Sequence, residues 1–265
     1  TYADGAKMIV WTGKTYTPGG NVTLSDSNDG TDSVVDGDIA IQAAATLSMG
    51  SAQLTVGGDF ANAGTFGGTN DTQLTMFIAT AAGHTIDMGS GNFEDLDFNG
   101  IGGGWSFTDA NNTVDDDMTI SAGTLAGSTN ITVGGGAVIG NGAINMTGGT
   151  FLVDGTGNFG GNTAWTFSSL TFGDGTGATA TTATGSGSIT VNETLTVAAA
   201  QILNAGTKTW TLSDSTGCPC TPFVMSGTFN YNTSTFVHNS TAATNLTGSE
   251  QNVPGYYNLS LIPTG

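Results

Sequence analysis

A short motif that occurs three times in this chain constrains its fold more strongly than any other feature. The motif begins with valine and an acidic or amide residue, continues with alternating apolar residues, and is followed by a second alternating run. Its copies occupy residues 35–58, 114–135 and 191–212, so their starting points are 79 and 77 residues apart. Self-similarity at a fixed period is typical of repeat proteins, in which each unit buries its apolar face against its neighbours.

A second motif recurs with nearly the same period. It has the form aromatic-x-x-Leu-x-apolar and occupies residues 93–98, 167–172 and 256–261, at spacings of 74 and 89 residues. The two motifs share no residues, yet both return at about the same interval along the chain. Together they predict a repeat architecture with units of about 75–90 residues.

Short bursts of alternating residues predict β-strands within each unit. Apolar residues alternate with threonine, serine or asparagine, as in Leu54-Thr55-Val56 and Ile189-Thr190-Val191, and no stretch has apolar residues at helical spacing. The bursts recur about every eight residues and are separated by Gly, Asn and Asp, which tolerate positive φ in turns. Three such strands make one coil of a β-helix, so each unit should hold three or four coils.

We therefore expect an all-β fold: a β-solenoid, or parallel β-helix, of short strands in three imperfect units. A single elongated solenoid would cover residues 1–265, with an N-terminal coil and acidic loop at 1–34 and repeat units at 35–98, 99–172 and 173–261. The alternative is a β-sandwich or two small all-β domains. Those folds would normally have longer strands, and they would leave the long period unexplained.

The charge of the chain is strongly unbalanced. It contains three lysines, no arginine and 21 acidic residues, which gives a formal net charge of −18. Binding to nucleic acid or to anionic membranes requires basic residues, so neither class of partner is expected. An acidic surface stays soluble, attracts divalent cations and suits an extracellular environment. No run of 18 consecutive apolar residues is present, so we expect no membrane insertion. The start at Thr1, without a signal peptide, is expected of a mature processed chain or an excised segment.

Two clusters of oxygen-bearing side chains predict calcium binding, because hard cations take several carboxylate and amide oxygens as ligands. In the first loop the glycine comes one position too early for an EF-hand, and the nonapeptide calcium repeat is absent from the chain. The alternative is therefore that both clusters are solvated turns. The candidate ligands are Asp26, Asn28, Asp29 and Asp32 in one loop, and Asp115 and Asp117 in the other.

The two cysteines, Cys218 and Cys220, are separated by a single proline. They do not form the Cys-x-x-Cys pattern of a redox site, and neither His84 nor His238 lies at metal-ligand spacing from them. In an oxidising environment we expect either a local disulfide that closes a turn or a crosslink to another subunit.

The sequence does not predict an enzyme. Cleavage of a polysaccharide needs paired carboxylates at a defined separation. Glu94 and Asp95 are adjacent on one predicted strand, so alternation sends their side chains to opposite faces. The three lysines, at positions 7, 14 and 208, form no basic cluster. No Ser-His-Asp arrangement or phosphate-binding loop is visible either.

Glycans are a further class of partner that the sequence suggests. Ten asparagines head an Asn-x-Ser/Thr triplet, the acceptor pattern for N-glycosylation. Some of these triplets are expected by chance in a chain so rich in asparagine and threonine, but a surface-layer glycosylation system could use them. The ten positions are Asn21, Asn70, Asn111, Asn130, Asn145, Asn192, Asn232, Asn239, Asn245 and Asn258.

Three stretches, Leu54–Phe60, Met118–Leu125 and Tyr256–Leu261, resemble the repeats of large prokaryotic extracellular proteins. Those proteins are β-solenoids of the filamentous-haemagglutinin and autotransporter types, which serve as adhesins, stalks and surface structures. The resemblance covers most of residues 35–261 and is one of repeat style, so it transfers no binding residues. It implies a location outside the cell, at the cell surface, and a non-enzymatic role.

We therefore expect an extracellular structural protein, a solenoid subunit of a fibre, sheath or surface layer. The ends of a solenoid expose unpaired strand edges that are normally capped, and no polar cap is evident in this sequence. This predicts that copies stack head to tail into a homopolymer.

Two alternative functions remain open from the sequence. A cell-surface adhesin or stalk would bind a glycan or protein, and it would display an exposed aromatic cluster on one side of the solenoid. Trp105, Trp165 and Trp210 could supply such a cluster, although we expect buried positions in the ladders for each of them. A polysaccharide-active β-helix enzyme would need a groove of converging carboxylates.

Overall fold

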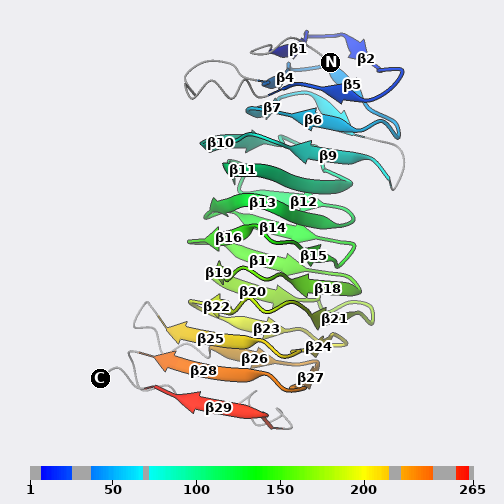
Figure 1. Ribbon diagram of the computed structural model, residues 1–265. Coiled ribbons are helices and arrows are strands. Elements are labelled where there is room, and N and C mark those ends of the chain that lie inside the picture. Colours follow the sequence, from blue (N-terminus) through cyan, green and yellow to red (C-terminus); the bar gives the residue numbers. More distant parts are fainter. Residues whose placement is uncertain (1–6, 26–36, 68–71, 215–221, 241–254, 263–265) are drawn as a thin grey trace.

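The computed structural model describes residues 7–25, 37–67, 72–214, 222–240 and 255–262. These residues form strands and turns without any helix, and the strands stack in parallel into a β-solenoid (Figure 1). The chain winds from the N-terminal end at the top of Figure 1 to the C-terminal end at the bottom, which makes the molecule an elongated rod. The prediction of an all-β solenoid is confirmed.

Each coil passes through three faces, numbered here in the order in which the chain meets them. On a given face, strands of successive coils pair in parallel, with about 4.8 Å between neighbouring strands. Face 1 consists of β1 (Met8–Val10), β4 (Ile39–Ile41), β7 (Phe60–Asn62), β10 (Ala82–Asp87), the second halves of β11 (Asp95–Phe107) and β13 (Met118–Gly127), β16 (Ala143–Met146), β19 (Trp165–Phe167), β22 (Ile189–Val191), β25 (Thr209–Asp214), β28 (Thr235–Ser240) and β29 (Asn258–Leu261).

Faces 2 and 3 complete each coil. Because β11 and β13 each run from face 3 to face 1 without a break, these two faces form one continuous sheet. Face 2 consists of β2 (Thr15–Tyr16), β5 (Thr46–Ser48), β8 (Thr65–Gly67), β12 (Asn111–Val114), β14 (Asn130–Val133), β17 (Thr150–Val153), β20 (Ser169–Phe172), β23 (Leu195–Val197) and β26 (Phe223–Met225), with a single bridge from Phe93 to Val114 between β8 and β12. Face 3 consists of β3 (Val22–Thr23), β6 (Leu54–Val56), β9 (Leu74–Phe77), the first halves of β11 and β13, β15 (Val138–Ile139), β18 (Gly157–Gly160), β21 (Ala180–Ala183), β24 (Ile202–Asn204) and β27 (Thr228–Asn230).

The core fills the interior of the coils. Alternate residues of each strand point inward, so inward side chains of successive coils lie one above another in files that run along the rod. Aromatic rings dominate several of these contacts. Trp210 stacks on Phe236 with ring centroids 5.9 Å apart, and Phe77 stacks on Phe98 at 5.6 Å. The interior is therefore a continuous apolar column, which each coil extends by one layer.

Polar side chains at the corners between faces join successive coils. The carboxylate of Asp38 accepts a hydrogen bond from the backbone N–H of Asp59, at 2.8 Å. One coil later, the carboxylate of Asp59 accepts the N–H of Thr85, also at 2.8 Å. A stack of parallel coils presents a row of backbone donors at each corner, and one Asp or Asn per coil can satisfy the donor of the next coil.

The recurrent sequence motifs do not fall on a single face of the solenoid. The strand at the centre of the first motif lies on face 1 in the first copy, on face 3 in the second and on face 2 in the third. The second motif changes face in the same order, from face 3 to face 2 to face 1. The strands concerned are Ile39–Ile41, Met118–Ile120 and Leu195–Val197 in the first motif, and Leu96–Phe98, Leu170–Phe172 and Leu259–Leu261 in the second.

Successive copies of the first motif are eleven strand segments apart. With β11 and β13 counted as two segments each and the Phe93 bridge as one, eleven segments lead from β4 to the first half of β13, and eleven more lead to β23. Eleven is not a multiple of three, so each copy begins one face away from the previous copy. The repeat is therefore a run of strands and not a whole number of coils. The division of the chain into units at 35–98, 99–172 and 173–261 stays a prediction.

Candidate functional site

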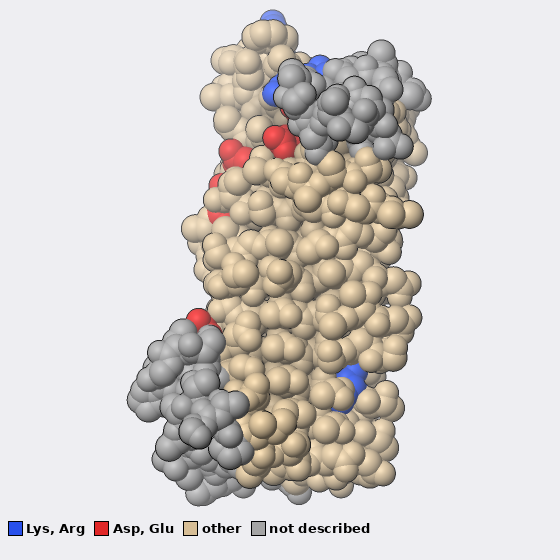
Figure 2. Space-filling model, turned by 60° about the vertical axis from the view of Figure 1, so that its left-hand side comes forward, with Lys and Arg blue, Asp and Glu red and all other residues tan. Residues whose placement is uncertain are grey.

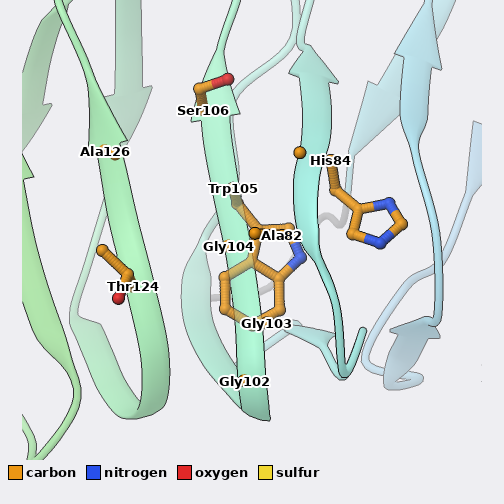
Figure 3. A pocket seen from close by; sticks show the side chains of 10 residues that line it. Ala82, His84, Gly102, Gly103, Gly104, Trp105, Ser106, Thr124 and Ala126 are labelled. Atoms are coloured by element: carbon orange, nitrogen blue, oxygen red, sulfur yellow. The ribbon is translucent and has the colours of Figure 1, made fainter. Parts of the chain in front are cut away.

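A shallow hollow of about 390 Å³ lies on the side of the rod, on face 1 over β10, β11 and β13 (Figure 3). It exists because the strands carry small residues there: Gly104 pairs in register with Ala82 on one side and with Thr124 on the other. The residues that line it are Ala82, Gly83, His84, Gly102, Gly103, Gly104, Trp105, Ser106, Thr124 and Ala126.

Trp105 belongs to the core beneath this hollow and is only 1 % exposed. Its ring packs on Phe98, with centroids 5.1 Å apart, and lies against the backbone at Gly103 and Gly123. No hydrogen-bond partner for its Nε1 is found among the described residues. The indole therefore supports the hollow from inside and offers no aromatic surface to a ligand.

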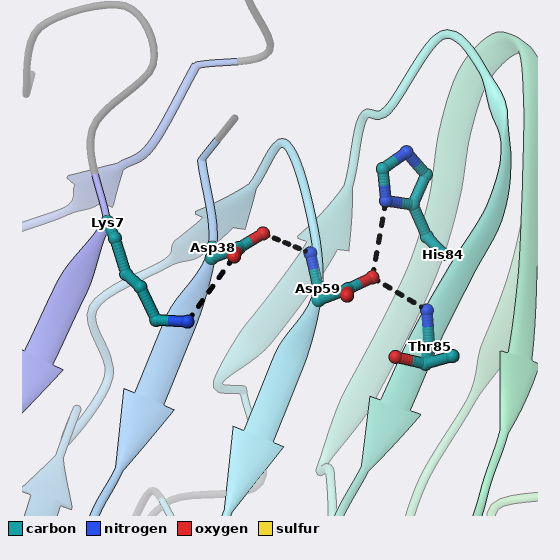
Figure 4. A network of polar contacts seen from close by, with 5 residues as sticks. All are labelled: Lys7, Asp38, Asp59, His84 and Thr85. Carbon is teal, nitrogen blue, oxygen red and sulfur yellow. Dashed lines mark hydrogen bonds and ion pairs between the residues drawn. The ribbon is translucent and has the colours of Figure 1, made fainter. Parts of the chain in front are cut away.

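A row of polar and charged side chains at the corner between faces 3 and 1 links the first coils (Figure 4). The ammonium group of Lys7 lies 3.4 Å from the carboxylate of Asp38, and Nδ1 of His84 lies 3.3 Å from Oδ1 of Asp59. The side chains of Lys7 and Asp59 are more than one third exposed, and pairs of this kind typically contribute about 0–1 kcal/mol. The row joins successive coils and aligns backbone donors.

The chemistry that the hollow can perform is limited by its lining. Among its lining residues there is no carboxylate, cysteine or lysine. The imidazole of His84 is directed toward Asp59 at the rim (Figures 3 and 4), and no hydrogen bond joins it to Ser106 in the described part of the chain. A nucleophile needs a base within hydrogen-bonding reach, so the hollow lacks the arrangement for acyl or glycosyl transfer.

Carboxylates gather instead on face 3, at Asp95 and Asp97 of β11 and at Asp117 in the next coil. Burial raises the pKa of Asp97, and hydrogen bonds from Ser121 oppose that rise. Burial also raises the pKa of Asp95; the backbone N–H of Asp117 opposes this rise, and the Asp117 carboxylate adds to it. These groups concentrate negative charge on face 3 at the two coils that contain β11 and β13.

The structure places only part of the predicted calcium ligands. Asp115 accepts hydrogen bonds from the side-chain amide of Asn92 at 3.1 and 3.2 Å, and Asp117 accepts the backbone N–H of Ala137 at 3.0 Å. The described residues contain no group of three or more His, Cys, Asp or Glu side chains suited to a metal ion. The four other candidates, Asp26, Asn28, Asp29 and Asp32, lie outside the described residues, and calcium binding stays a prediction.

Two other sequence predictions are also left without a test. Cys218 and Cys220 lie outside the described residues. Among the predicted glycan acceptors, Asn130 donates from its amide to Asn111 at 2.9 Å and accepts the backbone N–H of Thr150 at 2.9 Å. Those two asparagines form a ladder on the solvent side of face 2, where a glycan on Asn130 would replace one of the two hydrogens of its side-chain amide.

Two buried basic side chains were not identified from the sequence. Lys208 is 1 % exposed, and its Nζ donates to the carbonyl oxygens of Gly161 at 3.0 Å and Gly187 at 2.8 Å. His238 is 5 % exposed. The alternation of the strands could have identified both residues. Lys208 lies two residues before the inward Trp210, and His238 lies two residues after the inward Phe236, so both are expected to face inward.

Comparisons of the chain with protein-family models, with curated proteins and with solved structures each find no match. In the part of the chain that the structure describes, no helix is long and apolar enough to cross a membrane. Three surfaces can then bear on function: the uncharged hollow on face 1, the carboxylates of face 3, and the first and last coils that the structure describes.

Proposed function

We propose that the protein is an extracellular structural β-solenoid whose copies stack end to end into a fibre, sheath or surface layer. One observation carries the proposal. Of the eleven large apolar side chains that are exposed among the described residues, seven belong to the first and last coils. These seven are Ile9, Trp11 and Tyr16 at one end, and Tyr257, Leu259, Leu261 and Ile262 at the other.

The N-terminal end coil combines apolar surface with positive charge. Trp11 is 61 % exposed, and it lines a hollow of about 340 Å³ together with Tyr16, Lys7 and Lys14. Two of the three lysines of the chain thus lie at this end. In a molecule with a formal charge of −18, these two cations reduce the repulsion that a second copy would meet at this end, and Figure 2 shows basic side chains at the top of the rod with acidic ones just below them.

The C-terminal end coil offers a matching apolar surface. Leu261 is 57 % exposed and Leu259 is 42 % exposed, although both belong to a strand whose counterparts in earlier coils are buried. Strand β29 pairs with β28 on one edge, and β1 pairs with β4 on one edge, both on face 1. Stacking β29 of one copy on β1 of the next would continue face 1 and bury apolar surface, at about 25 cal/mol per Å².

The adhesin alternative, which includes the haemagglutinin and autotransporter types, receives less support from the geometry. It called for an exposed aromatic cluster on one side, but Trp105, Trp165 and Trp210 are each at most 1 % exposed. The enzyme alternative called for converging carboxylates in a groove, and the hollow on face 1 has none in its lining. Both observations favour a structural role.

The proposal can be tested by assembly of the purified chain, followed by sedimentation velocity and negative-stain electron microscopy. The diagnostic variant is Leu261→Lys, which places a cation opposite the end that holds Lys7 and Lys14. Its matched control is Ile101→Lys, because Ile101 is 85 % exposed but lies in the middle of the rod. Wild type and the control should form fibres at the same concentration, whereas Leu261→Lys should require a concentration at least about tenfold higher.

A repeat of the experiment with a chelator tests the calcium prediction at the same time. Loss of fibres on chelation, restored by added calcium, would assign the acidic residues to a calcium-dependent assembly. Wild-type protein that stays monomeric at high concentration, with both end coils protected from hydrogen exchange, would contradict the proposal.

A further inference from the structure

His238 occupies a position in the core that neighbouring coils fill with apolar residues. The inward file on face 1 reads Phe167, Val191, Leu212, His238 and Leu261, and each residue is in register with the next. The side chain of His238 is 5 % exposed, and the ring of Tyr256 meets it edge to face with centroids 6.2 Å apart. The imidazole is therefore enclosed by leucine and aromatic carbon.

Neither ring nitrogen of His238 has a hydrogen-bond partner in the part of the chain that the structure describes. The other histidine of the chain is different: Nδ1 of His84 lies 3.3 Å from a carboxylate oxygen of Asp59. A buried polar group without a partner is unfavourable when neutral, and a buried charge without a partner is more unfavourable still. His238 can thus remain in the core only while it is uncharged.

The elements packed against His238 supply no compensating charge. Strand β25 presents Leu212 and β29 presents Leu261, while Tyr256 is the titratable side chain whose ring contacts the imidazole. No described carboxylate pairs with it, and burial lowers the pKa of His238 below its usual value of 6.5. As the pH falls through the ordinary histidine range, the opened chain takes up a proton that the closed coil does not, so acid favours opening.

His238 lies where a solenoid can open locally. Strand β28, which carries it, pairs with β25 above and with β29 below, and β29 is the last described strand of the rod. Coils of a solenoid contact only their neighbours, so β28 and β29 can separate from β25 while the coils above β25 stay folded.

We propose that His238 is an acid-sensitive latch: its protonation releases β28 and β29 from the stack, while the coils above β25 remain folded. The latch belongs to the solenoid itself and operates in a single copy. Its consequence for assembly, that acid would dismantle fibres joined through this end, rests on the function proposed above.

Hydrogen exchange of the dilute, monomeric chain, followed by mass spectrometry at pH 7.5 and pH 5, tests the latch. The variants are His238→Leu, which restores the apolar file, and His84→Leu as the matched control. Because chemical exchange itself depends on pH, variants are compared at the same pH. We expect peptides from β28 and β29 to lose protection in wild type relative to His238→Leu at pH 5, by up to about tenfold per pH unit below the usual histidine pKa, but not at pH 7.5.

His84→Leu should behave like wild type in β28 and β29, and peptides from β12 to β20 should remain protected in all three proteins. A second variant, His238→Gln, keeps a polar side chain that does not titrate, so it should lack the pH dependence even where it weakens the coil. Equal pH dependence in wild type, His238→Leu and His238→Gln would overturn the latch. That result would leave the assembly proposal standing, because assembly is measured separately at neutral pH.

Discussion

The coil that contains Trp105 and the coils that contain Trp165 and Trp210 place the same side chain on the same face, but they treat its N–H group differently. Nε1 of Trp165 donates to the carbonyl of Gly142 at 2.9 Å, and Nε1 of Trp210 donates to that of Ala205 at 3.1 Å. For Nε1 of Trp105, no acceptor is found among the described residues.

The corners next to these tryptophans explain the difference. Above Trp105, β11 passes from face 3 to face 1 as one continuous strand through the glycine-rich segment 100–104, and the ring packs directly under that backbone. Before Trp165 and Trp210 the corner is a separate turn. Trp210 donates to a carbonyl of that turn, at Ala205, whereas Trp165 donates to Gly142 in the corresponding turn of the previous coil. The upper coil depends on the fit of the ring to glycine, whereas the lower coils also satisfy the ring's hydrogen bond.

The largest expected effect comes from filling the space that glycine leaves above Trp105. An added Cβ at Gly103 would overlap the carbonyl oxygen of Ala79 and would lie 2.7 Å from Cζ2 of Trp105. Gly103→Ala should therefore lower the free energy of unfolding by at least about 3 kcal/mol, since backbone and ring must both move. Gly67→Ala, where no atom lies within 4 Å of the added Cβ, is the control and should change urea denaturation by less than about 1 kcal/mol.

A smaller effect should separate the two kinds of tryptophan. Trp165→Phe leaves the carbonyl of Gly142 buried without its donor, whereas Trp105→Phe removes a donor that has no described acceptor. Trp165→Phe should therefore cost about 1–3 kcal/mol more than Trp105→Phe in denaturant unfolding. Equal losses would mean that the hydrogen bond of the lower coils contributes nothing and that ring volume alone matters.

The smallest effect concerns Lys208, a third buried N–H group of the lower coils, which has two carbonyl acceptors. Burial lowers the pKa of Lys208 from 10.5 to about 8. Between those two values the unfolded chain binds the proton and the folded chain does not, so stability should rise as the pH increases from 8 to 10.5.

We expect a rise on the order of 1–2 kcal/mol, measured as the difference between wild type and Lys208→Met at each pH, because the acceptors partly stabilise the charged form. A difference that stays constant over this range would show that Lys208 titrates normally. Comparison with Lys208→Met removes the contribution of the other titrating groups.

Much of the fold could be predicted from the sequence because its signal is local. Bursts such as Leu54-Thr55-Val56 predict both a strand and the residues of that strand that face inward. The recurrence of two motifs indicates that the strands stack in repeating units. The face on which each copy lies could not be predicted, because it depends on how many residues each corner uses. The corners differ in length from coil to coil. Their lengths are known only from the register of paired strands, such as Ile39 with Phe60 or Leu195 with Phe223.

The candidate site was less accessible to prediction. The hollow on face 1 arises where Gly104 lies between Ala82 and Thr124, three residues that are distant in sequence and come together only through the register of the coils. Lys208 and His238 do lie at positions that alternation assigns to the inward side of the strand. Charged and polar residues are nevertheless usually predicted to face outward. Whether such a residue finds an acceptor depends on carbonyl groups one or two coils away, which no local pattern encodes.

Because copies of the first motif are eleven strand segments apart, the length of the rod is coupled to the rotation of one end relative to the other. Duplication of one unit would lengthen the stack by three and two-thirds coils. It would also rotate all later coils by one third of a turn about the long axis of the rod. A lineage that gained or lost single units would therefore reorient whatever its distal end carries. Only the gain or loss of three units at a time would keep the original orientation of the distal end.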